Sequence, residues 1–179
     1  MPMSQHRAAL AAILVAVVAI YALSVVPAIA APSVPANPVV AAAIQYDGTW
    51  QGECWAFVKK VVREATGQEM GFDYRQGYFD AGATEVTVAA ARPGDIIQIA
   101  NDANSGPNAD YPGLHSSIVV ENLGNGLFHV IDSNQNYDGM VRHRTEYSPS
   151  ASAARYGLNF HIYRVVAGAA ARSAPGPRP

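Results

Sequence analysis

The chain contains a single cysteine, Cys54, within the segment Gly-Glu-Cys-Trp at residues 52–55. One cysteine forms no disulfide within a chain, so Cys54 is either a small buried apolar residue or a reactive thiol. A thiol is a good nucleophile only when it is ionised, and a helix N-terminus or a neighbouring imidazolium favours the ionised form. Apolar residues at helical spacing follow Cys54 up to Gly67, a helix-ending glycine. The thiol is therefore expected in the first turn of a helix, where backbone N–H groups favour negative charge.

A nucleophilic thiol needs a base, and the base needs a group that orients it. His115 is the expected base, because it begins an apolar strand directly after the long polar loop at residues 101–114. The glycine-rich turn at residues 124–126 predicts a hairpin that returns the chain beside this strand. Asp132 and Asn134 lie two apart on the returning strand and should point to the same face. Asp132 is the expected orienting residue, and Asn134 either shares that role or binds substrate.

Three further residues around the thiol have expected roles. Gln51 is expected to donate its side-chain amide to the oxyanion that forms during attack on a carbonyl. Trp55 is expected either in the core or as a wall of the substrate cleft. The carboxylate of Glu53 opposes ionisation of the adjacent thiol, so it should point away or be offset by another group. His129 is an alternative orienting residue, although strand alternation turns it away from the face expected for Asp132.

Composition and residue spacing exclude several classes of function. The chain carries a formal net charge of −2 and shows no basic patch, so nucleic-acid binding is not expected. Its histidines lack the close ligand spacing of a zinc site, and neither a metal ion nor another cofactor is expected. The protein is expected to act as a monomer on a peptide substrate.

The apolar pattern predicts an α+β domain with helices packed on one side of an antiparallel sheet. The helices come first, and the strands follow as an antiparallel meander. Besides the helix that begins at Cys54, short helices are expected at residues 38–44 and 151–156. The expected strands are residues 96–99, 115–121, 127–134, 140–145 and 159–166.

The two ends of the chain differ from this central domain. Residues 1–31 combine one positive charge with a long apolar run and small residues after Pro27, which is typical of a signal peptide or an N-terminal membrane anchor. Either alternative places the domain outside the cytoplasm, and the membrane is a partner only if the segment stays uncleaved. Residues 32–37 are expected to be a linker, residues 38–166 the folded domain, and residues 167–179 a disordered tail.

Four motifs in order resemble those of CHAP domains, the cysteine, histidine-dependent amidohydrolases/peptidases related to NlpC-type cell-wall hydrolases. They are Gly-Glu-Cys-Trp at 52–55, Pro-Gly-Asp at 93–95, the strand that begins at His115, and Ile-Asp-Ser-Asn at 131–134. The resemblance covers about residues 45–165 and departs from the family at Glu53, where Gln is common, and at Asp132, where Glu is commoner.

The resemblance implies a papain-like fold, with Cys54, His115 and Asp132 as catalytic residues. It also implies hydrolysis of amide bonds in peptidoglycan by an exported enzyme. Two alternatives remain open. A transglutaminase-like acyl transferase uses the same Cys, His, Asp order, and Gly-Glu-Cys-Trp resembles its cysteine motif. A non-catalytic cell-surface binding module of the same fold would keep the domain and bury an unreactive thiol.

Overall fold

The computed structural model describes residues 37–166 of the chain. Four α-helices lie in this part: α1 (Pro38–Ile44), α2 (Cys54–Thr66), α3 (Gln76–Asp80) and α4 (Pro149–Ala154). Asn37 caps α1 by accepting a 2.9 Å hydrogen bond from the Val39 N–H, the role that Asn prefers at this position. Gly67 ends α2 in the left-handed conformation (φ 71°), as expected for a glycine at the end of a helix.

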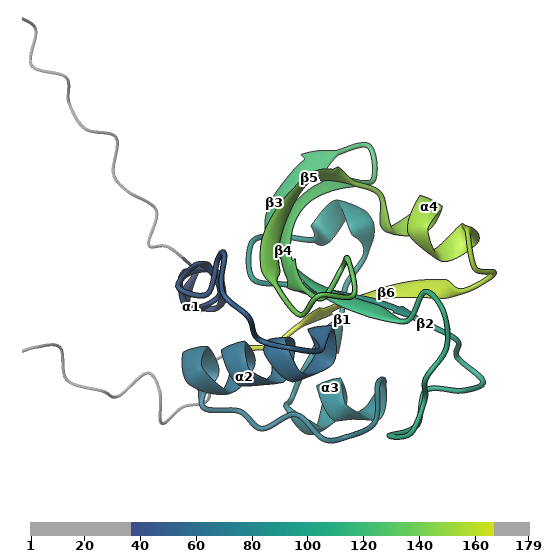
Figure 1. The fold of residues 1–179 in the computed structure, drawn as a ribbon, viewed down its shortest axis with the longest axis horizontal. Coiled ribbons are helices and arrows are strands. Elements are labelled where there is room, and N and C mark those ends of the chain that lie inside the picture. The colour runs from purple at the N-terminus through teal and green to yellow at the C-terminus, as the bar shows by residue number, and fades with distance from the viewer. Residues whose placement is uncertain (1–36, 167–179) are drawn as a thin grey trace, which may run out of the picture. The chain divides into compact units, whose positions relative to one another are not determined.

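Six strands form one sheet in which every neighbouring pair is antiparallel (Figure 1). The order across the sheet is β1-β6-β2-β3-β4-β5. In chain order, the strands are β1 (Thr84–Glu85), β2 (Ile96–Ala100), β3 (His115–Gly124), β4 (Leu127–Ser133), β5 (Val141–Tyr147) and β6 (Asn159–Arg164), with a short 3-10 helix, η1 (Val88–Ala90), between β1 and β2. β2 to β5 make a meander, and β6 returns to lie between β1 and β2.

Each face of the sheet packs against its own apolar core. The larger core contains the buried face of α1 and α2 and the side chains of Ile96, Ile118 and Ile131. The second core, on the other face, contains Val119 and Val130 together with residues of α4 and η1. Because β2 lies between the two cores, all five of its residues are buried. Figure 1 shows α4 on the opposite side of the sheet from α1 and α2.

The α+β class and the antiparallel sheet expected from the sequence are confirmed. The expectation that helices pack on only one side is wrong, because α4 covers the second face and contributes to its core. The simple meander is also incomplete, since β6 pairs with both β1 and β2. β1 and η1 have no counterpart among the expected elements, because two or three residues carry too little periodicity to indicate a strand or helix.

Within residues 37–166, no helix is long and apolar enough to cross a membrane. The expected signal peptide or anchor (1–31), nearly all of the linker (32–37) and the tail (167–179) lie outside the described residues.

Candidate active site

Cys54 is the first residue of α2, and the segment before it is hydrogen-bonded to the end of β4 and to the connection between β4 and β5. Gln51 and Gly52 donate their backbone N–H groups to the carbonyl of Gly139 at 2.8 and 3.1 Å. Ser133 ends β4, and its Oγ lies 2.6 Å from the Gly52 carbonyl and 3.1 Å from the Gly139 carbonyl. These bonds place the N-terminus of α2 at the end of β4.

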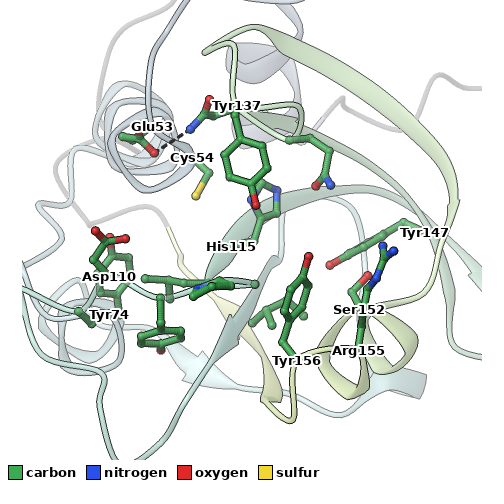
Figure 2. A pocket seen from close by; sticks show the side chains of 18 residues that line it. Glu53, Cys54, Tyr74, Asp110, His115, Tyr137, Tyr147, Ser152, Arg155 and Tyr156 are labelled. Atoms are coloured by element: carbon green, nitrogen blue, oxygen red, sulfur yellow. Dashed lines mark hydrogen bonds between the residues drawn. The ribbon is translucent and has the colours of Figure 1, made fainter.

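The first turn of α2 lacks a side-chain cap. Glu53 occupies the N-cap position with no capping hydrogen bond from its side chain. Its carboxylate instead accepts a 2.8 Å hydrogen bond from the side-chain amide of Asn134 (Figure 2). The N–H groups of the first turn have no partner within the helix itself, and they give this end of α2 a partial positive charge beside Cys54.

His115 lies against both Cys54 and Asp132. Its Nε2 is 3.3 Å from Oδ2 of Asp132, within ion-pair distance although the two atoms are not aligned for a directed hydrogen bond. The side chain of His115 is 14% exposed and that of Asp132 is fully buried. Figure 2 shows the Cys54 sulfur beside the His115 ring. The three residues proposed from the sequence as nucleophile, base and orienting group therefore come from α2, β3 and β4 to one place.

The surroundings of His115 favour its protonated form. Burial alone lowers the pKa of the imidazole, but the neighbouring Asp132 carboxylate and Cys54 thiol outweigh burial and raise this pKa to about 9. The nearby opposite charge stabilises an imidazolium more than burial destabilises it. At neutral pH the ring can therefore act as a proton donor as well as a positive neighbour of the thiol.

Arg144 on β5 binds the same carboxylate oxygen of Asp132 that faces His115. Its Nε donates to Oδ2 of Asp132 at 2.8 Å, and its Nη2 donates to the same oxygen. The guanidinium also lies 4.0 Å from the centre of the Tyr147 ring. This stacking depends on a β-bulge in which Glu146 takes a positive φ of 56°, because the extra residue turns Arg144 and Tyr147 to the same face. Sequence motifs gave no signal for this ion pair.

A buried polar network supports the backbone of His115 from β2. Gln98 is 1% exposed, and its Nε2 donates to the carbonyl oxygen of His115 at 3.1 Å. Its Oε1 accepts hydrogen bonds from the hydroxyl groups of Tyr78 at 2.7 Å and Ser116 at 2.9 Å. The nitrogen and the oxygen of the Gln98 side-chain amide are both hydrogen-bonded. The backbone of His115 is therefore held by the Gln98 side chain as well as by the backbone hydrogen bonds between β2 and β3.

Cys54 and His115 open onto a cavity of about 760 Å³. Its wall is rich in tyrosine and carries a few charged groups, as Figure 2 shows. A cavity of this volume is in the range that holds a small organic ligand or a short peptide. In addition to Cys54 and His115, the cavity is lined by five tyrosines and three charged residues: Tyr74, Tyr111, Tyr137, Tyr147 and Tyr156, and Glu53, Asp110 and Arg155.

Gly113 lets the polar loop pass close to α4 two residues before His115. Its φ is +90°, and a Cβ added there would lie 2.4 Å from the ring of Tyr156. Both the backbone conformation and the contact exclude a larger residue without movement. The end of the polar loop at Gly113 therefore lies against Tyr156, and both residues line the cavity.

Two residues with expected roles lie elsewhere. Gln51 does not line the cavity; its Nε2 donates to Oγ1 of Thr49 at 3.0 Å and its Oε1 accepts from Nζ of Lys60 at 2.8 Å. Trp55 is 8% exposed and belongs to the larger core, with its ring centre 5.0 Å from that of Tyr74. Of the two alternatives for Trp55, the structure shows the core position.

Asn134 lines the cavity but does not share the face of Asp132. It follows the end of β4 and has a positive φ of 64°, so the strand alternation that would align the two side chains has ended. Its Nδ2 bonds Glu53, and its Oδ1 accepts a 2.8 Å hydrogen bond from the Gly139 N–H. Asn134 thus joins the first turn of α2 to the β4–β5 connection.

His129 is not close to His115. Its Nε2 lies 2.9 Å from Nδ1 of His143 on β5, and Nε2 of His143 lies 3.9 Å from Oδ2 of Asp47. The alternation of β4 turns His129 away from Asp132, as expected. Within residues 37–166, no group of three or more His, Cys, Asp or Glu side chains is arranged to hold a metal ion.

No protein-family model and no curated protein matches this chain. Among solved structures, a crystal structure of Ly7917 aligns with a TM-score of 0.49 at 14% identity, over 71% of this chain and 61% of that chain. A structure of Ly7917 with the hydrolysing product of MDP aligns with a TM-score of 0.47 at 14% identity, over 73% and 63% of the two chains. The type VI native effector–immunity complex Tae3–Tai3 from Ralstonia pickettii aligns with a TM-score of 0.43 at 16% identity, over 72% and 97%.

This chain thus spans less than two thirds of the two Ly7917 chains. All three TM-scores lie below 0.5.

Proposed function

We propose that the protein is an exported cysteine amidohydrolase or endopeptidase with a papain-like site, which cleaves amide bonds in bacterial peptidoglycan. One observation carries the proposal. The only thiol of the chain stands at the start of a helix beside a histidine whose pKa is raised to about 9, and both line an open cavity. A purely structural cysteine needs neither a charged partner nor access to a cavity.

In the proposed mechanism, Cys54 and His115 work as a thiolate–imidazolium pair. Since Nε2 of His115 faces Asp132, Nδ1 is the nitrogen left to exchange a proton with the thiol. Asp132 fixes the orientation of the ring and stabilises its positive charge. Arg144 in turn holds the carboxylate of Asp132 in place.

The covalent steps follow from these positions. The thiolate forms a C–S bond with the amide carbonyl carbon, and His115 gives its proton to the leaving nitrogen as the C–N bond breaks. The amine leaves, and a thioester remains on Cys54. A water molecule then gives a proton to His115 and attacks the thioester. The C–S bond breaks, the carboxylic acid product leaves, and the thiolate–imidazolium pair is restored.

The oxyanion of each tetrahedral intermediate needs hydrogen-bond donors. The backbone N–H of Cys54 is the proposed donor, because the first turn of α2 has no side-chain cap. Gln51 is a poorer candidate than the sequence indicated, since its amide is bonded to Thr49 and Lys60. The Asn134 amide lines the cavity and, if its bond to Glu53 opens, can contact substrate.

Peptidoglycan as the substrate rests on the motif resemblance and on the apolar N-terminal segment of the sequence. The cavity is compatible with a peptide, because its tyrosines offer both apolar faces and hydroxyl groups to a chain of mixed polarity. Export is a proposal from the sequence of residues 1–31.

The test is digestion of purified peptidoglycan sacculi, with mass spectrometry of the released fragments. New amino and carboxyl termini should appear with the wild-type protein and not with Cys54→Ala or His115→Ala. A matched control is His143→Ala, which removes a histidine outside the cavity and should keep activity. If the wild-type protein and Cys54→Ala release the same fragments, the proposed function is wrong.

The same incubation separates hydrolysis from acyl transfer. A primary amine added in excess intercepts the thioester of an acyl transferase and appears in the products, whereas a hydrolase yields the free carboxylic acid. Absence of both products, with retained binding to sacculi, would favour the non-catalytic binding module.

A further inference from the structure

One side of the cavity is acidic. Glu53 and Asp110 both line it, from the start of α2 and from the polar loop. Both lie close to Tyr74, where burial first, and then the negative charges of Cys54, Glu53 and Asp110, raise the pKa of the phenol to about 12. Asp110 is exposed and, within residues 37–166, no cation lies within ion-pair distance of it.

The other side of the cavity carries a guanidinium. Arg155 follows α4 directly and lines the cavity together with Ser152, one turn earlier. Ser152 contacts Tyr147, which stacks on Arg144. Within the described part of the chain, Arg155 has no carboxylate within ion-pair distance, whereas five other arginines do.

Cys54 and His115 lie between these two sides. Figure 2 shows Asp110 and Tyr74 on one side of the thiol and imidazole, with Ser152, Arg155 and Tyr156 on the other. A substrate bound across the pair therefore meets negative charge at one end and a planar, bidentate donor at the other. Arg is well suited to binding a carboxylate in this way, because its parallel N–H groups match the two oxygens.

The geometry points to a charge-polarised subsite pair: the cavity binds a short peptide whose carboxylate contacts Arg155 and whose ammonium group contacts Asp110 and Glu53. This inference rests on the proposed function and extends it by naming the part of the substrate that the cavity binds: a short peptide segment with a free carboxylate and a free ammonium group. It also makes Arg155 and Asp110 specificity-determining residues, since each discriminates a charged terminus from its blocked form.

Binding can be measured separately from catalysis in the Cys54→Ala protein, which keeps the cavity and lacks the nucleophile. The probes are trialanine, N-acetyl-trialanine, trialanine amide and the doubly blocked peptide, titrated by NMR. Trialanine should bind about fivefold more tightly than either singly blocked form, a difference in keeping with exposed charge pairs. Added salt should reduce the preference, because the contacts are solvent-accessible.

Three substitutions show which residue recognises which end of the peptide. Arg155→Gln should abolish the preference for the free carboxylate and keep that for the free amine. Asp110→Asn should reduce the preference for the free amine, with Glu53 still present, and keep that for the free carboxylate. Arg155→Lys should restore part of the carboxylate preference. Arg92→Gln removes an exposed arginine outside the cavity and should change neither preference.

The inference fails if the four peptides bind equally, if none binds, or if the carboxylate preference survives Arg155→Gln. Each of these results leaves the proposed function standing when the wild-type protein still digests sacculi. Conversely, charge-selective binding without any digestion by the wild-type protein would support the subsites and contradict the proposed enzyme.

Discussion

His115 should make the stability of the fold depend on pH in a defined direction. Its pKa rises from the ordinary 6.5 to about 9 in the folded protein. One pKa unit corresponds to about 1.4 kcal/mol, so the folded environment favours the imidazolium by about 3 kcal/mol. The His115 ring is buried between Cys54 and Asp132, where water screens charges little, so this free energy needs no reduction for solvent screening.

The sign follows from proton binding. Between pH 6.5 and 9, the folded state holds a proton on His115 that the unfolded state has released. Stability therefore falls as pH rises through this window. The contribution of His115 is complete below pH 6.5 and is lost above about pH 9.

Urea denaturation of the wild-type protein and of His115→Gln, at a series of pH values, measures this contribution. The stability advantage of the wild-type protein over the variant should shrink by about 3 kcal/mol between about pH 6 and pH 9.5. In a Cys54→Ala background the pH-dependent difference should become smaller and persist, since Asp132 remains. An advantage that stays constant across this range would show that His115 has no raised pKa in the folded protein.

Three further substitutions test the support of the site. Arg144→Met should lower the free energy of unfolding by about 3 kcal/mol, because it leaves the buried Asp132 carboxylate without its main partner; a loss below about 1 kcal/mol in urea denaturation would contradict this. Gly113→Ala should reduce activity on sacculi at least about tenfold with little loss of secondary structure, because its Cβ meets the Tyr156 ring and φ is positive; unchanged kcat/KM would contradict it. Ser133→Ala should lower the free energy of unfolding by about 1–2 kcal/mol, because it releases the half-buried Gly52 carbonyl before α2; an unchanged Tm in thermal unfolding would show that the bond contributes nothing.

The positions of Cys54 and His115 could be predicted because their signals are local. Cys54 precedes a run of apolar residues at helical spacing that ends at Gly67, so its place in the first turn follows from periodicity. His115 begins an apolar strand after a polar loop, and the hairpin at residues 124–126 brings Asp132 beside it. Such elements depend on residues close in sequence, and their observed bounds lie within a few residues of the expected ones.

The supporting residues could not be predicted, because their partners are distant in sequence or depend on backbone irregularities. Arg144 reaches Asp132 across a strand pair and stacks on Tyr147 only because a bulge at Glu146 shifts the register. Gln98 stands in an apolar strand, where one polar residue gives no hint of the network beneath His115.

Asn134 and α4 show two limits of sequence patterns. Strand alternation predicted that Asn134 faces the same way as Asp132, but the strand ends at Ser133 and the next residue takes a positive φ. A period-2 argument holds only while the strand continues. The position of α4 on the second face could not be predicted because six residues carry no distinct apolar stripe.

The pairing of Cys54 with His115 can be measured through the rate of Cys54 alkylation by iodoacetamide as a function of pH, because the chain has a single cysteine. The wild-type protein is expected to react well below the ordinary thiol pKa of about 8.5, and His115→Ala is expected to shift the rate profile to higher pH. A slow reaction at neutral pH, with the same profile in His115→Ala, would contradict the Cys54–His115 pair and with it the proposed enzyme.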